Sequence, residues 1–102
     1  MPDQPLENAH TFTLEVNNKM GVHARPAAMI VRIASHFSGE IWVTKKDGER
    51  VNAKSIMGIM MLAAARGSEL TFECSPEDAP ELEKQMSDLF APNFRTNKPA
   101  FF

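Results

Sequence analysis

The chain has 102 residues, of which 43% are hydrophobic and 24% are charged. This balance excludes wholesale disorder and low-complexity or collagen-like sequence, and the length suits one domain with its own core. Eleven Lys and Arg against thirteen Asp and Glu leave a net charge of -2, so binding to the phosphates of nucleic acid is not expected. The longest uncharged apolar stretch, 55–65, is too short to span a membrane, so no membrane insertion is expected.

The first residues, 1–5, show neither a basic leader nor an apolar run, so no secretory signal is predicted. Cys74 is the only cysteine and cannot form an intrachain disulfide. Both observations fit a cytoplasmic protein in a reducing compartment. Two prolines and few apolar residues make 1–9 a flexible lead-in. We expect one domain over 10–91 and a C-terminal tail over 92–102.

The first third of the chain predicts a strand and a helix. Apolar and polar side chains alternate over 10–16, as in a half-buried strand. After a turn-like segment, apolar residues recur at steps of three and four, which predicts a helix from about Ala24 to His36. Pro26 falls in its first turn, where proline is tolerated.

The middle of the chain predicts a hairpin and a second helix. Residues 40–46 and 50–53 read as two short strands joined by Asp47-Gly48, a hairpin turn signal. Ser55 then opens an apolar segment that continues toward Ala65, which suits a short helix capped by the serine hydroxyl.

The last third predicts a strand over 69–74 and a third helix. Ser75 is the expected N-cap of that helix, with Pro76 as its first residue. Its predicted buried stripe consists of Leu82, Met86, Leu89 and Phe90. The tail beyond it either packs locally or stays mobile. The order strand, helix, strand, strand, helix, strand, helix predicts an α+β fold with an antiparallel or mixed sheet covered by helices on one face.

The segment from Met20 to Ala28 brings a glycine, a histidine and an arginine to the start of the first helix. A helix N-terminus presents unpaired amides and partial positive charge, which favour an anion such as phosphate. Neutral imidazole is a competent nucleophile, so His23 could carry a phosphoryl group that Arg25 steadies. Because Pro26 has no N–H, the backbone donors would come from residues such as Ala24, Arg25 or Ala27.

Spacing alone favours a plainer interpretation, since a histidine near a helix start more often makes an ordinary surface or capping contact. His10 and His36 are interpreted as structural or solvent-exposed. No histidine pair has the spacing of a zinc helix and none clusters with Cys74, so no metal site is predicted. No glycine-rich nucleotide loop is present, and no cofactor is expected.

Two blocks of sequence carry a resemblance to a known family: Gly21-Val22-His23-Ala24-Arg25-Pro26-Ala27 and Val51-Asn52-Ala53-Lys54-Ser55-Ile56-Met57-Gly58. Over roughly 12–90 the chain resembles HPr, the histidine phosphocarrier of the bacterial phosphoenolpyruvate-dependent phosphotransferase system. The resemblance implies a βαββαβα open-faced sandwich, in which three helices cover one face of a four-stranded antiparallel sheet. Met20 and Val22 stand where the family usually has leucines.

The resemblance also implies a function. His23 would accept a phosphoryl group on its pros nitrogen from phosphorylated enzyme I and donate it to enzyme IIA for sugar uptake, with Arg25 flanking the phosphate. The protein would then be a phosphoryl carrier rather than an enzyme that turns over a small substrate, and a monomer is expected. Ser55 falls on the family's regulatory serine, which HPr kinase/phosphorylase phosphorylates in some lineages, and this role is compatible with an N-cap.

Methionines at helical spacing are more often core filler than contact surface, so some of Ile56, Met57, Met60 and Met61 are expected in the core. The resemblance instead implies an exposed apolar patch for partners, formed by Ile56, Met57 and Met60 beside the histidine, and Met20 is assigned to the same surface. Lys54 and Arg25 would add positive charge on that side and steer acidic partners.

Two alternatives to sugar transport remain open. One is a regulatory binding protein that acts through Ser55 phosphorylation or through docking, with His23 dispensable. The other is a carrier in a nitrogen-related phosphotransfer chain. The presence of both His23 and Arg25 argues against the first alternative, whereas the sequence does not separate the second from the transport role.

Overall fold

Seven elements follow one another in the predicted order. The computed structural model describes residues 8–46 and 48–94. The elements are β1 (His10–Glu15), α1 (Ala24–Ala34), β2 (Trp42–Lys45), β3 (Arg50–Asn52), α2 (Ile56–Met61), β4 (Glu69–Cys74) and α3 (Ala79–Phe90). The predicted α+β class is confirmed.

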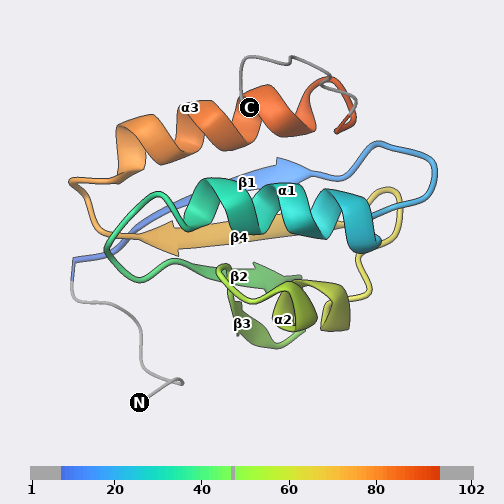
Figure 1. Ribbon diagram of the computed structural model, residues 1–102, viewed down its shortest axis with the longest axis horizontal. Helices are drawn as coiled ribbons and strands as arrows, with labels where there is room; N and C mark the ends of the chain where they lie inside the picture. Colours follow the sequence, from blue (N-terminus) through green and yellow to red (C-terminus); the bar gives the residue numbers. More distant parts are fainter. Residues whose placement is uncertain (1–7, 47, 95–102) are drawn as a thin grey trace.

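The four strands form one antiparallel sheet in the order β1-β4-β2-β3. The last strand in the sequence, β4, lies between β1 and the β2–β3 hairpin, where Phe72 is paired with both Phe12 and Val43. All three helices lie against the same face of this sheet (Figure 1). The open-faced sandwich is therefore confirmed.

Alternation along β4 separates the two faces of the sheet. Leu70, Phe72 and Cys74 are fully buried beneath the helices. Thr71, on the uncovered face, shares a hydrogen bond of 2.8 Å with Thr13 of β1. The helices complete the core with one stripe each, and α3 buries the four predicted residues, Leu82, Met86, Leu89 and Phe90.

The first two helices end earlier than predicted because their last turns tighten. After α1, the N–H of His36 donates to Ile33 O at 3.1 Å, and that of Phe37 donates to Ala34 O at 3.1 Å. Such i to i−3 bonds are common where a helix terminates. After α2, Ala63 has a φ of 50°, a left-handed conformation that the helix cannot include.

The predicted start of α3 was wrong by three residues. The N-cap is Asp78, not Ser75. Pro76 lies before the helix, and the proline in its first turn is Pro80, the second helical residue. Residues 76–78 form turns in which Ser75 O accepts the N–H of Asp78 at 3.1 Å. Both Ser75-Pro76 and Asp78-Ala79-Pro80 resemble the start of a helix, and the earlier of the two belongs to the turn.

Ser55 is confirmed as the N-cap of α2, because its Oγ accepts the N–H of Gly58 at 3.0 Å. Replacing Ser55 with alanine leaves that amide without its acceptor, so the free energy of unfolding should fall by about 1 kcal/mol. Urea denaturation measures the change. Ser35→Ala is the matched control, since Ser35 is exposed and its hydroxyl bonds to no other described residue. Equal losses in both variants would show that the cap contributes nothing.

Several predictions fall outside the described residues: most of the lead-in over 1–9, Asp47 of the hairpin turn, and the tail over 95–102. Within 8–46 and 48–94, none of the helices combines the length and apolar character needed to cross a bilayer.

Candidate functional site

A backbone hydrogen bond joins the loop before α1 to the segment that follows α2. The N–H of Val22 donates to Ala64 O at 2.8 Å, and Asn18 Nδ2 donates to Gly21 O at 2.7 Å. Gly21 has a φ of 71°, and a Cβ there would lie 2.5 Å from Ala64 O. Only glycine fits this approach, so the loop delivers the next residues to a fixed place at the start of α1.

His23 occupies the N-cap position of α1, and its exposed side chain makes no capping hydrogen bond. The backbone N–H groups of Ala24 and Arg25 have no hydrogen-bond partner in the described part of the chain. The N–H of Ala27 was a candidate donor to phosphate, but it donates to His23 O at 2.9 Å and is therefore unavailable. The imidazole thus stands beside two free donors at the positive end of a helix.

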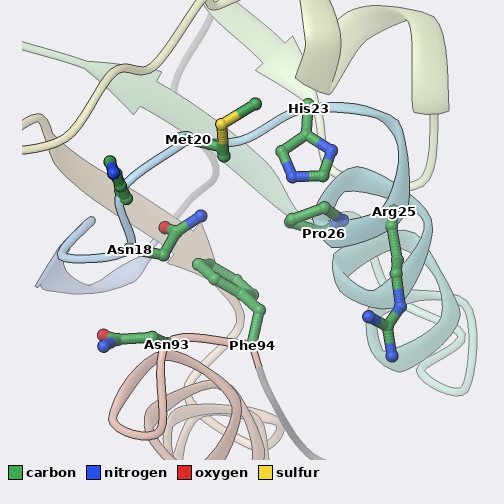
Figure 2. A pocket seen from close by; sticks show the side chains of 8 residues that line it. Asn18, Met20, His23, Arg25, Pro26, Asn93 and Phe94 are labelled. Carbon is green, nitrogen blue, oxygen red and sulfur yellow. The ribbon is translucent and has the colours of Figure 1, made fainter.

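A cavity of about 370 Å³ opens beside this imidazole. The His23 ring lies at the edge of the cavity near Pro26 (Figure 2). Phe94, from the turn after α3, lies on the other side of the cavity from the ring. The residues that line the cavity are Asn18, Lys19, Met20, His23, Arg25, Pro26, Asn93 and Phe94. The cavity therefore joins the loop after β1, the start of α1 and the end of α3.

Arg25 lines the same cavity, as the expected phosphate-flanking role requires, but its guanidinium points away from the His23 ring (Figure 2). Arg25 is exposed and forms no hydrogen bond or ion pair with another described residue. No contact therefore holds the guanidinium in this orientation, and rotation about its side-chain bonds can turn it toward an anion at the helix terminus.

Five large apolar side chains are exposed, four on α2 and one in the loop before α1, and together they are here called the methionine patch: Met20, Ile56, Met57, Met60 and Met61. The expectation that some of the four α2 residues are core was wrong, because Ile59 and Leu62 supply the buried positions. A helix of six residues has only one narrow face to bury. Met61 was not among the predicted contact residues, although its spacing of four from Met57 places both on one face.

Two hydrogen bonds show that α1 and α2 run in opposite directions. Val22 is bonded to Ala64 just after α2, whereas Lys54 Nζ, just before α2, donates to Phe37 O beyond the end of α1. The ammonium of Lys54 therefore lies at the opposite end of α1 from His23, and its predicted role in steering acidic partners stays a prediction. Ser55 shares that distant end.

The other two histidines lie outside this site. His10 Nε2 is 3.5 Å from Glu83 Oε1, and His36 is exposed beyond the C-terminal end of α1. No group of three or more His, Cys, Asp or Glu side chains suited to a metal ion occurs among residues 8–46 and 48–94. Four residues that line the cavity were not predicted: Asn18, Lys19, Asn93 and Phe94. Asn93 and Phe94 lie beside it only through the tertiary fold.

Burial, followed by repulsion from the carboxylates of Asp78, Glu83 and Glu73, raises the pKa of the Cys74 thiol to about 11. The thiol is therefore expected to resist alkylation at pH 8 in the folded protein and to react once urea unfolds it. Because the unfolded thiol ionises near pH 9, this residue's contribution to stability is present below pH 9 and is lost between pH 9 and 11. Rapid alkylation without denaturant would contradict the burial.

A family model described as the PTS HPr component phosphorylation site matches residues 10–91. The chain belongs to the HPr family. The phosphocarrier protein HPr of Neisseria meningitidis is 47% identical over 77 residues, which cover 76% of this chain and 85% of that protein. The HPr-like protein Crh of Bacillus subtilis is 49% identical over 72 residues, 70% of this chain and 84% of that protein.

The solved HPr structure from Thermoanaerobacter tengcongensis superposes with a TM-score of 0.77 at 44% identity, over 87% of this chain and 99% of that one. A second HPr structure from that bacterium is described as a dimer, so the expected monomer stays a prediction. Membership of the HPr family supports a phosphocarrier role in the phosphotransferase system, whose enzymes are the general class of partner.

Proposed function

We propose that His23 accepts a phosphoryl group from phosphorylated enzyme I and passes it to enzyme IIA. The observation that carries this proposal is the exposed imidazole at the N-cap of α1, beside two backbone N–H groups without partners in the described residues. In the first transfer a nitrogen of the ring forms a bond to phosphorus while the bond from phosphorus to enzyme I breaks. In the second transfer a nucleophile of enzyme IIA bonds to phosphorus while the P–N bond breaks, which regenerates the free imidazole of His23.

The local electrostatics support a group that must be taken up and released. The free N–H groups of Ala24 and Arg25 and the helix dipole favour the phosphoryl oxygens, and a guanidinium can reach the same place. Since the site is exposed, these interactions are partly screened by water and salt. Moderate stabilisation suits a carrier, because a tightly held phosphoryl group would not be passed on.

Incubation with enzyme I and phosphoenolpyruvate should attach one acid-labile phosphoryl group per chain. The His23→Ala variant should acquire none, because no other described nucleophile lies at this helix terminus. His36→Ala is the matched control, since it removes another exposed histidine, which lies beyond the other end of α1. Phosphate retained by the His23→Ala variant, or lost in the His36→Ala variant, would exclude His23 as the acceptor.

We propose that the methionine patch is the surface on which enzyme I and enzyme IIA dock. Unbranched, polarisable methionine side chains can adapt to more than one partner. Met57, the second residue of α2, is 73% exposed, so Met57→Glu should raise the KM of enzyme I for this protein at least about tenfold while changing kcat little. The control is Thr11→Glu, which adds the same charge on the uncovered face of the sheet. An equal rise in KM in the two variants would refute the proposal.

We propose that Ser55 is a second, regulatory phosphorylation site. It lies at the start of α2, next to two residues of the methionine patch, so a phosphate there would place nearly two negative charges against docking partners. Ser55→Asp keeps a capping oxygen and adds charge, whereas Ser55→Asn keeps the cap without the charge. If Ser55→Asp raises the KM of enzyme I for this protein and Ser55→Asn does not, regulation by phosphorylation is supported. Equal KM values for the two variants refute it.

We propose that the protein is cytoplasmic and that the phosphoryl group it carries serves sugar uptake. A His23→Ala strain should then lose sugar uptake. If uptake persists and a regulatory output is lost, the protein acts in a nitrogen-related or signalling chain. If neither changes, His23 has no role in the cell.

A further inference from the structure

The turn after α3 holds Phe94 in a strained backbone conformation beside the His23 cavity. Asn93 and Phe94 have φ values of 57° and 62°, in the left-handed region that bulky side chains rarely adopt. The N–H of Asn93 donates to Phe90 O at 2.9 Å, and that of Phe94 donates to Leu89 O at 3.0 Å. A conformation of this kind persists only where its surroundings enforce it, and such positions cluster at functional sites.

The strained turn places an aromatic ring as one wall of the cavity. Phe94 is 3% exposed and packs on Phe90 with ring centroids 4.7 Å apart. In Figure 2 the Phe94 ring lies between Asn18 and Pro26 and faces the space beneath the imidazole. The ring therefore gives the cavity an apolar surface across from His23, beside the polar side chains of Asn18 and Asn93, whereas the N–H groups of Ala24 and Arg25 lie at the helix terminus on the imidazole's own side.

We propose that Phe94 is a positioning residue for phosphoryl transfer, whose ring closes the cavity beneath His23 and keeps the imidazole and its phosphoryl group at the N-terminus of α1. The proposal rests on His23 being the acceptor. With the ring in place, the imidazole cannot drop into the space toward α3, away from the free N–H groups. The ring also excludes water from that side, which slows attack of a water oxygen on phosphorus, the step that breaks the P–N bond and releases inorganic phosphate.

Phe90 provides a matched control for Phe94. Both are phenylalanines, both are 3% exposed and they contact each other, but only Phe94 lines the cavity. Phe94→Leu should lower the kcat for phosphorylation by enzyme I about tenfold and shorten the lifetime of the phosphorylated protein by a similar factor. The KM should stay within twofold of the parent protein, because the methionine patch is unchanged. Phe90→Leu should leave kcat and lifetime within twofold.

Phe94→Gly separates the ring from the turn, because glycine adopts the left-handed conformation without strain. If the ring is responsible, this variant also shows the lowered kcat and the shortened lifetime. If Phe94→Gly matches the parent protein, or if Phe90→Leu and Phe94→Leu have equal effects, Phe94 is only a core residue and the proposal is wrong. A parent protein that acquires no phosphoryl group at His23 would instead overturn the proposed function, so the two failures are distinguishable.

Discussion

Gly21→Ala should lower the free energy of unfolding by about 2–4 kcal/mol and also slow phosphorylation of His23. A Cβ at this position would lie 2.5 Å from Ala64 O and 2.9 Å from Ala65 Cα, and the backbone φ is 71°. Both neighbours are backbone atoms, so neither can yield without moving the segment after α2. Relief of the clash would stretch the hydrogen bond from Val22 to Ala64 and displace the start of α1.

Urea denaturation and the initial rate of enzyme I-dependent phosphorylation measure the two effects of Gly21→Ala. Gly67→Ala is the control, since Gly67 has a φ of 93° but a Cβ at that position would meet no other atom within 4 Å. That variant carries backbone strain of about 1–2 kcal/mol without a clash, and His23 should react at the parent rate. Equal destabilisation at both glycines would show that the contact with Ala64 is unimportant.

Phe72→Ala should have the largest effect on stability, a loss of about 3–5 kcal/mol. Phe72 is fully buried in β4, its ring stacks on Phe12 at 5.2 Å, and it meets Phe90 edge-on at 5.9 Å. Truncation leaves a void beneath both α3 and β1. Since small domains are stable by only about 5–15 kcal/mol, much of the margin would be lost.

The urea midpoint of the Phe72→Ala variant, at an unchanged m-value, measures this loss. Thr71→Ala tests the other face of the same strand, where the side chain has a single hydrogen bond to Thr13. Its cost should be about 1 kcal/mol or less. A loss at Thr71 as large as that at Phe72 would mean that the uncovered face contributes as much as the core.

Local patterns predicted the elements well, because each pattern is produced by the element that contains it. Alternation marked β1 and β4, and the hydroxyl of Ser55 marked the start of α2. The position of β4 between β1 and β2 was not predicted, since it depends on pairings such as Phe12 with Phe72, sixty positions apart in the chain. No local signal encodes such a pairing.

The candidate phosphoryl acceptor could be proposed from the sequence, but its surroundings could not. His23 was found because glycine, histidine, arginine and proline are adjacent in the sequence and resemble the HPr motif. Phe94 reaches the same cavity from the end of α3, and Lys54 turns away toward Phe37 O. Both outcomes depend on how α1, α2 and α3 pack together. Charge and hydropathy along the chain do not determine these contacts.

Because the helices cover only one side of the sheet, everything assigned to transfer and docking occupies one hemisphere of the protein (Figure 1). Thr11 and Thr13 of β1 are exposed on the opposite hemisphere. A fluorophore or a surface linker attached there through an introduced cysteine would point away from incoming partners. Immobilised in that orientation, the molecule offers its reactive side to solution, which makes sensor measurements of partner association practicable.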